Sequence, residues 1–294
     1  MSADEQLQVR VHGDAGRPTL VYLPGLHGDW TLVSSFRAAI AGQVRFVEFT
    51  YPRTLTWSLV DYARAVEGAL LSHGVRRGWV LGESFGSQVA WVLCDGVKRE
   101  AGSGLTESQW RARPESSPAG SSRDEAAPGG AAPGDRFQAE GLILAGGFVR
   151  HPIPWGVRLV RRLCRGASLT WLTGFLFVYA KYAWLRHRRA PETLASIAEF
   201  IARRTELDRQ AIVHRLTLIH DDDLRPTASR VTLPVHALNG LIDPIVPWWL
   251  VRPWLWRHCP GYRGGRTIGL ADHNVLGTAP RTAAEQVRAW IAPG

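Results

Sequence analysis

A chain of 294 residues is long enough to bury one large core, or one core with a subdomain. Its 45% hydrophobic content and 13 tryptophans exclude a disordered protein, and no apolar run is long enough to span a membrane. The formal net charge is +9, but residues 150–190 alone hold eight Arg and one Lys with no Asp or Glu. Because the rest of the chain is balanced, the charge does not predict a nucleic-acid-binding face.

The cysteines and the first residues of the chain indicate the cellular compartment of the protein. Cys94, Cys164 and Cys259 are odd in number and widely spaced, which favours a reducing environment over a disulfide framework or a metal site. Residues 1–11 are polar and lack the basic and apolar regions of a signal peptide. We therefore expect a cytoplasmic protein.

Strands and helices alternate in the N-terminal part. Period-two and short apolar runs predict strands at 8–11, 20–23, 45–49 and 78–81, and helical periodicity predicts helices at 30–41, 58–73 and 87–94. Such alternation predicts a doubly wound, mostly parallel sheet with helices on both faces.

The pattern changes after residue 98. Gly, Ala, Ser and Pro dominate residues 99–136, which we interpret as a disordered insertion. A strand is expected at 141–145, and helical periodicity then continues through 150–225 with a break near Pro191. Two further strands, at 235–238 and 266–269, and a helix at 282–291 complete the chain. We predict a core from 1–98, 137–149 and 226–294, with 150–225 inserted as a helical cap.

The pentapeptide Gly-Glu-Ser-Phe-Gly at 82–86 lies between a predicted strand and a predicted helix. Glycines two residues before and after Ser84 fit a nucleophile elbow, the sharp turn that holds a serine oxygen clear of the backbone. The five letters alone are weak, but strand, turn and helix together make Ser84 a candidate nucleophile.

A serine hydroxyl needs a base to accept its proton and an acid to orient that base. Asp243 and His273 each follow a predicted strand and occur in the order Ser, Asp, His of elbow-type hydrolases. Other carboxylates compete for the acid role. Asp221, Asp222 and Asp223 form a cluster that we interpret as a helix end or solvated turn, and Asp272 adjoins the histidine.

At these residues the sequence resembles the α/β-hydrolase superfamily. The strings that carry the resemblance are LPGLHGD at 23–29, GESFG at 82–86, GLIDPIVP at 240–247 and DHNVL at 272–276. It implies that Ser84 is the nucleophile, His273 the base and Asp243 the orienting acid, with no metal and no organic cofactor. It also implies that backbone N–H groups of Leu26 and Phe85 bind the oxyanion.

Two details stay open at this point. The oxyanion loop has Pro24 where the superfamily usually has histidine, and either His27 or Asp29 could supply its support. Glu83, beside the nucleophile, fits either a hydrogen bond behind the elbow or a capped buried contact.

The cap bears on the substrate. It combines a run of arginines with a stretch at 169–180 that is rich in Trp, Phe and Leu, which fits a helix packed over the pocket or an interfacial element that contacts anionic headgroups. The tryptophans at 248, 249, 254 and 256 favour a wall of the pocket or a helix core. These features favour a small-molecule ester with an apolar acyl or alkyl group, and a possible peripheral membrane contact.

The sequence thus predicts a serine hydrolase that acts through an acyl-enzyme. A thioesterase or an acyltransferase would use the same three residues. From another class, a ligand-binding or membrane-associated protein could keep this fold without turnover.

Overall fold

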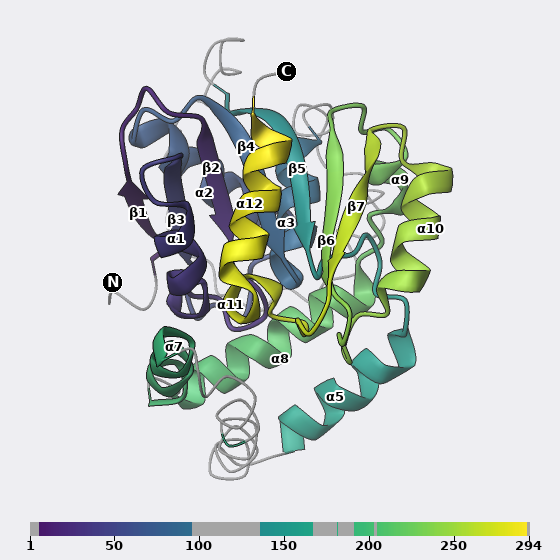
Figure 1. Cartoon of the computed structure of the whole chain (residues 1–294). Coiled ribbons are helices and arrows are strands. Elements are labelled where there is room, and N and C mark those ends of the chain that lie inside the picture. Colours follow the sequence, from purple (N-terminus) through teal and green to yellow (C-terminus); the bar gives the residue numbers. More distant parts are fainter. Residues whose placement is uncertain (1–5, 96–135, 167–180, 182–190, 203–204, 293–294) are drawn as a thin grey trace, which may run out of the picture.

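The computed structural model describes residues 6–95, 136–166, 181, 191–202 and 205–292. Its centre is a seven-stranded sheet in the order β1-β3-β2-β4-β5-β6-β7 (Figure 1). The strands are β1 (Gln8–His12), β2 (Thr19–Leu23), β3 (Arg45–Thr50), β4 (Arg77–Glu83), β5 (Gln138–Ala145), β6 (Val235–Gly240) and β7 (Tyr262–Ile268). All neighbours pair in parallel except β1 with β3. The predicted mostly parallel sheet is confirmed.

Strand β2 illustrates how the sheet is buried on both faces. Leu20 and Tyr22 belong to one buried cluster, whereas Val21 and Leu23 belong to the other, because successive side chains in a strand point to opposite faces. All four side chains are fully buried. This is the pattern of a central strand between two helical layers.

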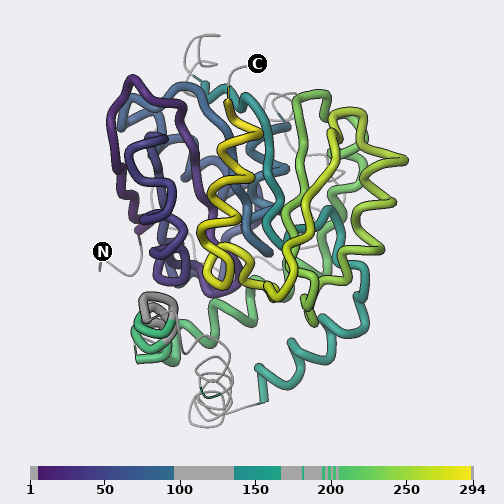
Figure 2. Tube along the Cα trace, in the orientation of Figure 1, coloured from purple at the N-terminus to yellow at the C-terminus, as the bar shows by residue number. Residues whose placement is uncertain are grey.

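The two helical layers come from different parts of the chain. Helices α1 (Ser34–Ile40), α11 (Val275–Thr278) and α12 (Pro280–Ile291) cover one face with the 3-10 turn η2 (Thr31–Val33). Helices α2 (Leu59–Ser72), α3 (Phe85–Cys94), α9 (Arg225–Ala228) and α10 (Trp248–His258) contribute to the other core cluster. Figure 2 shows the last helix, in yellow, crossing in front of the sheet beside the purple N-terminal part.

Helix α2 begins where its sequence predicts. The Ser58 hydroxyl accepts a hydrogen bond from the Asp61 amide, and the Asp61 carboxylate accepts one from the Ser58 amide. This capping box satisfies amides that the first helical turn leaves without a partner.

Three helices between β5 and β6 lie below the carboxyl ends of the parallel strands (Figure 1). They are α5 (Pro154–Gly166), α7 (Pro191–Ala202) and α8 (Glu206–Asp221). Helix α8 is joined to the core at several points. Arg53 Nε donates to Asp208 Oδ1 at 2.8 Å, and His214 Nε2 lies 2.8 Å from the Trp57 carbonyl oxygen.

Some expectations fall outside the described residues. These are most of the predicted insertion at 99–136 and residues 167–180 and 182–190 of the predicted cap. The division into core, insertion and cap therefore stays a prediction. Helix α10 is an element that the sequence pattern did not specify, and it contains Pro253. None of the helices in the described ranges is long and apolar enough to cross a membrane.

Candidate active site

Ser84 occupies the turn between β4 and α3. Its φ is 49°, a left-handed conformation that is uncommon for residues other than glycine and that often marks a functional site. The turn leaves no room for side chains at either flanking glycine. A Cβ at Gly86 would lie 2.1 Å from the Leu23 carbonyl oxygen, and one at Gly82 would lie 2.6 Å from Ser87 Cα. The two glycines are therefore required by close approach.

The structure brings Ser84, Asp243 and His273 together, although 189 residues separate the serine from the histidine. His273 Nε2 lies 2.9 Å from Ser84 Oγ, and His273 Nδ1 lies 2.9 Å from Asp243 Oδ2. The other Asp243 oxygen accepts hydrogen bonds from the amides of Ile245 and Val246. Those two bonds fix the carboxylate, so that Nδ1–H of His273 donates to it and Nε2 faces the serine.

The surroundings of His273 make it a stronger base. Burial by itself lowers the pKa of the imidazole, but the hydrogen bond to Asp243 and the charge of that carboxylate outweigh burial, and the pKa is raised. The negative charges of Glu83 and Asp272 act in the same direction. A raised pKa favours transfer of the serine proton to Nε2.

The competing carboxylates lie in other roles. Asp221 is the last residue of α8, Asp222 follows it as the C-cap, and Asp223 pairs with Arg225 and Arg150. Asp272 accepts hydrogen bonds from the Asn274 amide and the Thr278 hydroxyl, in the turn that leads into α11. The interpretation of 221–223 as a helix end agrees with the structure.

The predicted oxyanion donors flank the serine. Phe85 is the first residue of α3, and the loop at Gly25 and Leu26 lies against the nucleophile, since a Cβ at Gly25 would lie 3.3 Å from Ser84 Cβ. Within the described part of the chain, neither the Leu26 N–H nor the Phe85 N–H donates a hydrogen bond. Both amides are thus available to an oxygen atom bound beside Ser84.

Arg215 of α8 supports this loop, and sequence reasoning missed it. Its side chain is 2% exposed, Nη1 donates to the Leu26 carbonyl at 3.0 Å, and Nη2 donates to the Pro52 carbonyl at 3.2 Å. A Cβ at Gly28 would lie 2.3 Å from Nη1, so the loop fits closely around the guanidinium. Within the described ranges Arg215 pairs with no carboxylate. Nothing in the sequence distinguishes it from the other arginines.

The loop also has local supports. Asp29 Oδ1 accepts the Thr31 amide at 2.8 Å, and the Gly28 carbonyl accepts the Tyr51 amide at 2.7 Å. Of His27 and Asp29, the two side chains considered from sequence, Asp29 forms this hydrogen bond at the end of the loop. Arg215, which was not considered, holds the middle of the loop.

Glu83 lies behind the elbow and is buried. The hydroxyl of Tyr22, on the neighbouring strand β2, donates a hydrogen bond to its carboxylate. Burial raises the pKa of Tyr22 well above its usual value, and the Glu83 carboxylate raises it further. The first of the two options for Glu83, a hydrogen bond behind the elbow, is the one found.

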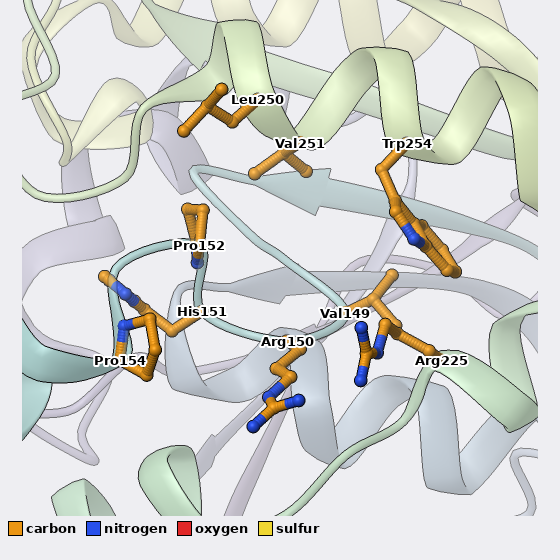
Figure 3. A pocket seen from close by; sticks show the side chains of 9 residues that line it. All are labelled: Val149, Arg150, His151, Pro152, Pro154, Arg225, Leu250, Val251 and Trp254. Carbon is orange, nitrogen blue, oxygen red and sulfur yellow. The ribbon is translucent and has the colours of Figure 1, made fainter.

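A cavity of about 320 Å³ lies between the loop after β5 and α10 (Figure 3). Its lining residues are Val149, Arg150, His151, Pro152, Pro154, Arg225, Leu250, Val251 and Trp254. Burial lowers the pKa of His151, and the charges of His273 and Asp243 also act on it, so the cavity borders the site. Of the four α10 tryptophans only Trp254 lines it. In the described ranges, no three His, Cys, Asp or Glu side chains gather as a metal site would require.

No protein-family model and no curated protein matches the sequence. Solved structures match over nearly the full length. An enol-lactonase from Burkholderia xenovorans LB400 has 16% identity and a TM-score of 0.67, covering 98% of this chain and 96% of that one. A hydrolase from Pseudomonas aeruginosa PA01 has 16% identity and a TM-score of 0.71, covering 98% and 94%. An esterase from Exiguobacterium antarcticum has 13% identity and a TM-score of 0.67, covering 98% and 96%. With its sheet order and this likeness, the chain has the α/β-hydrolase fold.

Proposed function

We propose that the protein is a serine hydrolase that cleaves carboxylic esters through an acyl-enzyme. The observation that carries the proposal is the hydrogen-bonded chain from Ser84 through His273 to Asp243, with the serine held at a positive φ. Two of the structural neighbours are described as an esterase and an enol-lactonase, which is in keeping with ester chemistry on this fold.

In the first half-reaction, Ser84 Oγ attacks the ester carbonyl carbon while its proton moves to His273 Nε2. The carbonyl oxygen becomes an oxyanion, which accepts hydrogen bonds from the Leu26 and Phe85 amides. The imidazolium, stabilised by Asp243, then gives its proton to the departing alkoxide, so that an alcohol leaves and the acyl group stays on Ser84.

In the second half-reaction, His273 Nε2 removes a proton from water as the water oxygen attacks the acyl carbon. The proton returns to Ser84 Oγ when the acid is released. No redox partner is required, and every proton is accounted for by His273.

The cavity supports an apolar acyl or alkyl group. Val149, Leu250, Val251 and Trp254 supply apolar surface, and the two lining arginines are engaged by Asp223. Arg225 and, to a lesser extent, Arg150 lower the pKa of that carboxylate, which keeps it ionised as their counter-charge. We place the protein in the cytoplasm, in keeping with the free thiols of Cys94, Cys164 and Cys259.

A fluorophosphonate probe with mass spectrometry tests the proposal. The wild type is expected to gain one phosphonyl group, Ser84→Ala none, and Ser72→Ala, an exposed serine on α2, the same as wild type. An unlabelled wild type, or equal labelling of Ser84→Ala, refutes the proposal and favours a binding protein without turnover.

A chain-length series of p-nitrophenyl esters and acyl-CoA thioesters then ranks the leaving groups. Higher kcat/KM for the oxygen esters of medium acyl chains is expected. Preference for the thioesters would reassign the enzyme as a thioesterase. An acyl-enzyme that reacts faster with added alcohols than with water would indicate an acyltransferase.

A further inference from the structure

Helix α5 presents three distinct faces. Successive residues turn by about 100° around a helix, so residues four and eight positions apart share a face. Val157 and Cys164 face the protein core. Trp155, Leu159 and Leu163 form a second, apolar line, which we call the α5 stripe. The third face carries the arginines at positions 158, 161, 162 and 165.

The α5 stripe is not the face by which the helix packs on the protein. Val157 is buried, whereas Trp155 is 70% exposed, Leu159 50% and Leu163 51%. One contact with α8 is the hydrogen bond that Arg209 Nη1 donates to the Cys164 carbonyl. Packing among the residues that the structure describes therefore does not account for this apolar line, and exposed apolar patches of this kind mark interaction sites.

More exposed apolar side chains lie at the same edge of the molecule. The loops after β6 and β7 and the start of α10 are close to the start of α5, below the sheet (Figure 1). The cavity residues Pro154 and Leu250 join α5 to α10 across this edge. The exposed side chains here are Leu241, Ile242, Ile245, Trp249, Leu250 and Leu270. Asp243 and His273 come from the same two loops, so this surface lies beside the candidate active site.

The positive charge of α5 indicates which kind of partner would bind the α5 stripe. Within the described ranges, none of the four α5 arginines pairs with a carboxylate. Residues 150–190 contain eight Arg and one Lys and no acidic residue. Arg158 Nε donates to His220 Nε2 at 3.3 Å, so its charge is not neutralised. An apolar line beside arginines without a carboxylate partner is the pattern of a helix that lies in the plane of a membrane surface, with arginines at the headgroups and Trp and Leu among the acyl chains. A nucleic acid would leave the α5 stripe without a partner.

We propose that the protein docks on anionic phospholipid surfaces through α5, with the edge that carries Ser84 turned toward the bilayer. The substrate class that follows is an ester of a membrane-associated acyl lipid. Docking depends only on the exposed surface, whereas the substrate class rests on the hydrolase function proposed above.

Co-sedimentation of the full chain with vesicles tests docking. Vesicles of phosphatidylcholine containing phosphatidylglycerol are expected to bind the protein at low salt, and vesicles of phosphatidylcholine alone to bind it at least tenfold less. Replacing Arg158, Arg161 and Arg162 by Gln should weaken binding by about fivefold for each arginine. Changing the α5 stripe to Ser at all three positions should weaken it more than tenfold.

Matched variants control for loss of charge and of apolar surface. Trp256→Ser removes a side chain that is 75% exposed at the far end of α10. Changing Arg257, Arg263 and Arg266 to Gln removes three exposed arginines elsewhere. Both controls should bind like the wild type. Hydrolysis of a water-soluble p-nitrophenyl ester should be unchanged in all variants, which shows that they fold.

The outcomes test docking, the hydrolase function and the substrate class separately. No sedimentation at low salt, equal binding to neutral vesicles, or α5 variants that bind like the wild type would overturn docking, as would capture by a protein partner in place of lipid. A wild type that binds vesicles but is not labelled by the fluorophosphonate probe leaves docking intact and refutes the hydrolase. If the enzyme is labelled and binds vesicles but does not hydrolyse esters of membrane-associated acyl lipids, only the proposed substrate class is refuted.

Discussion

Arg215→Met tests whether α8 positions the oxyanion loop. Methionine fills a similar volume but removes the guanidinium that bonds to the carbonyls of Leu26 and Pro52. Leu26 is also the residue whose amide is proposed to bind the oxyanion. Because the substitution removes the hydrogen bond to the Leu26 carbonyl, we expect the Leu26 amide to be held less firmly in place.

The two effects of this substitution on stability oppose each other. Two charge-assisted hydrogen bonds, worth about 1.5–3 kcal/mol each, are lost. The cost of burying a charge without a carboxylate partner, several kcal/mol, is recovered. The free energy of unfolding should therefore change by less than about 2 kcal/mol. The rate should change more: loss of a complete oxyanion donor costs about 10²–10³-fold in kcat, so a loosened donor should cost about 10- to 100-fold.

Steady-state kinetics on a p-nitrophenyl ester, with urea unfolding of the same samples, measures both quantities. We expect kcat to fall while KM stays nearly constant, because the oxyanion forms only in the transition state. Arg215→Lys should be intermediate, since one ammonium does not reproduce the planar fork. Arg209→Met, on the same helix, should keep the wild-type kcat. A folded Arg215→Met enzyme with full kcat would refute the reasoning.

Three further predictions concern charges. The acid limb of the kcat/KM profile should lie above the usual histidine pKa of about 6.5, because His273 must be neutral to accept a proton and its pKa is raised. Glu83→Gln should move that limb to lower pH, and an unmoved limb would contradict the role given to the Glu83 charge. Asp243→Asn should lower kcat by about 10⁴-fold in stopped-flow or steady-state assays, and a loss under tenfold would exclude it as the orienting acid. Arg37→Met should lower the free energy of unfolding by about 1.5–3 kcal/mol in urea titrations, because fully buried Glu48 loses the hydrogen bonds from Arg37 Nη1 and keeps its contact with His12 Nε2. A change below about 1 kcal/mol, on the order of a surface pair, would refute this.

The sequence predicted the elements of the site because their signals are local. Close approach at Gly82 and Gly86 permits no other residue, and the loops with Asp243 and His273 each follow an apolar strand. Parallel strands bring their carboxyl ends to one edge, so the meeting of the three residues follows from the fold class.

The parts that sequence reasoning missed depend on contacts between distant segments. Arg215 meets Leu26 across 189 residues, and no helix periodicity signals that contact. The partner of Glu83 follows only from the strand order, which places β2 beside β4. Helix α10 was not predicted from the sequence, because Trp249 and Trp256 are apolar yet exposed and Pro253 interrupts the helical pattern of apolar residues.

The contacts of α8 with the core limit how the protein can be re-engineered. Arg53, Trp57 and Leu26, all in loops that follow β2 and β3, are bonded to residues of this one helix. An exchange of the whole segment between β5 and β6 for that of another protein with the α/β-hydrolase fold would remove the support of the core's own loops. A graft that keeps residues 205–221 and replaces only what precedes them should preserve the proposed esterase activity.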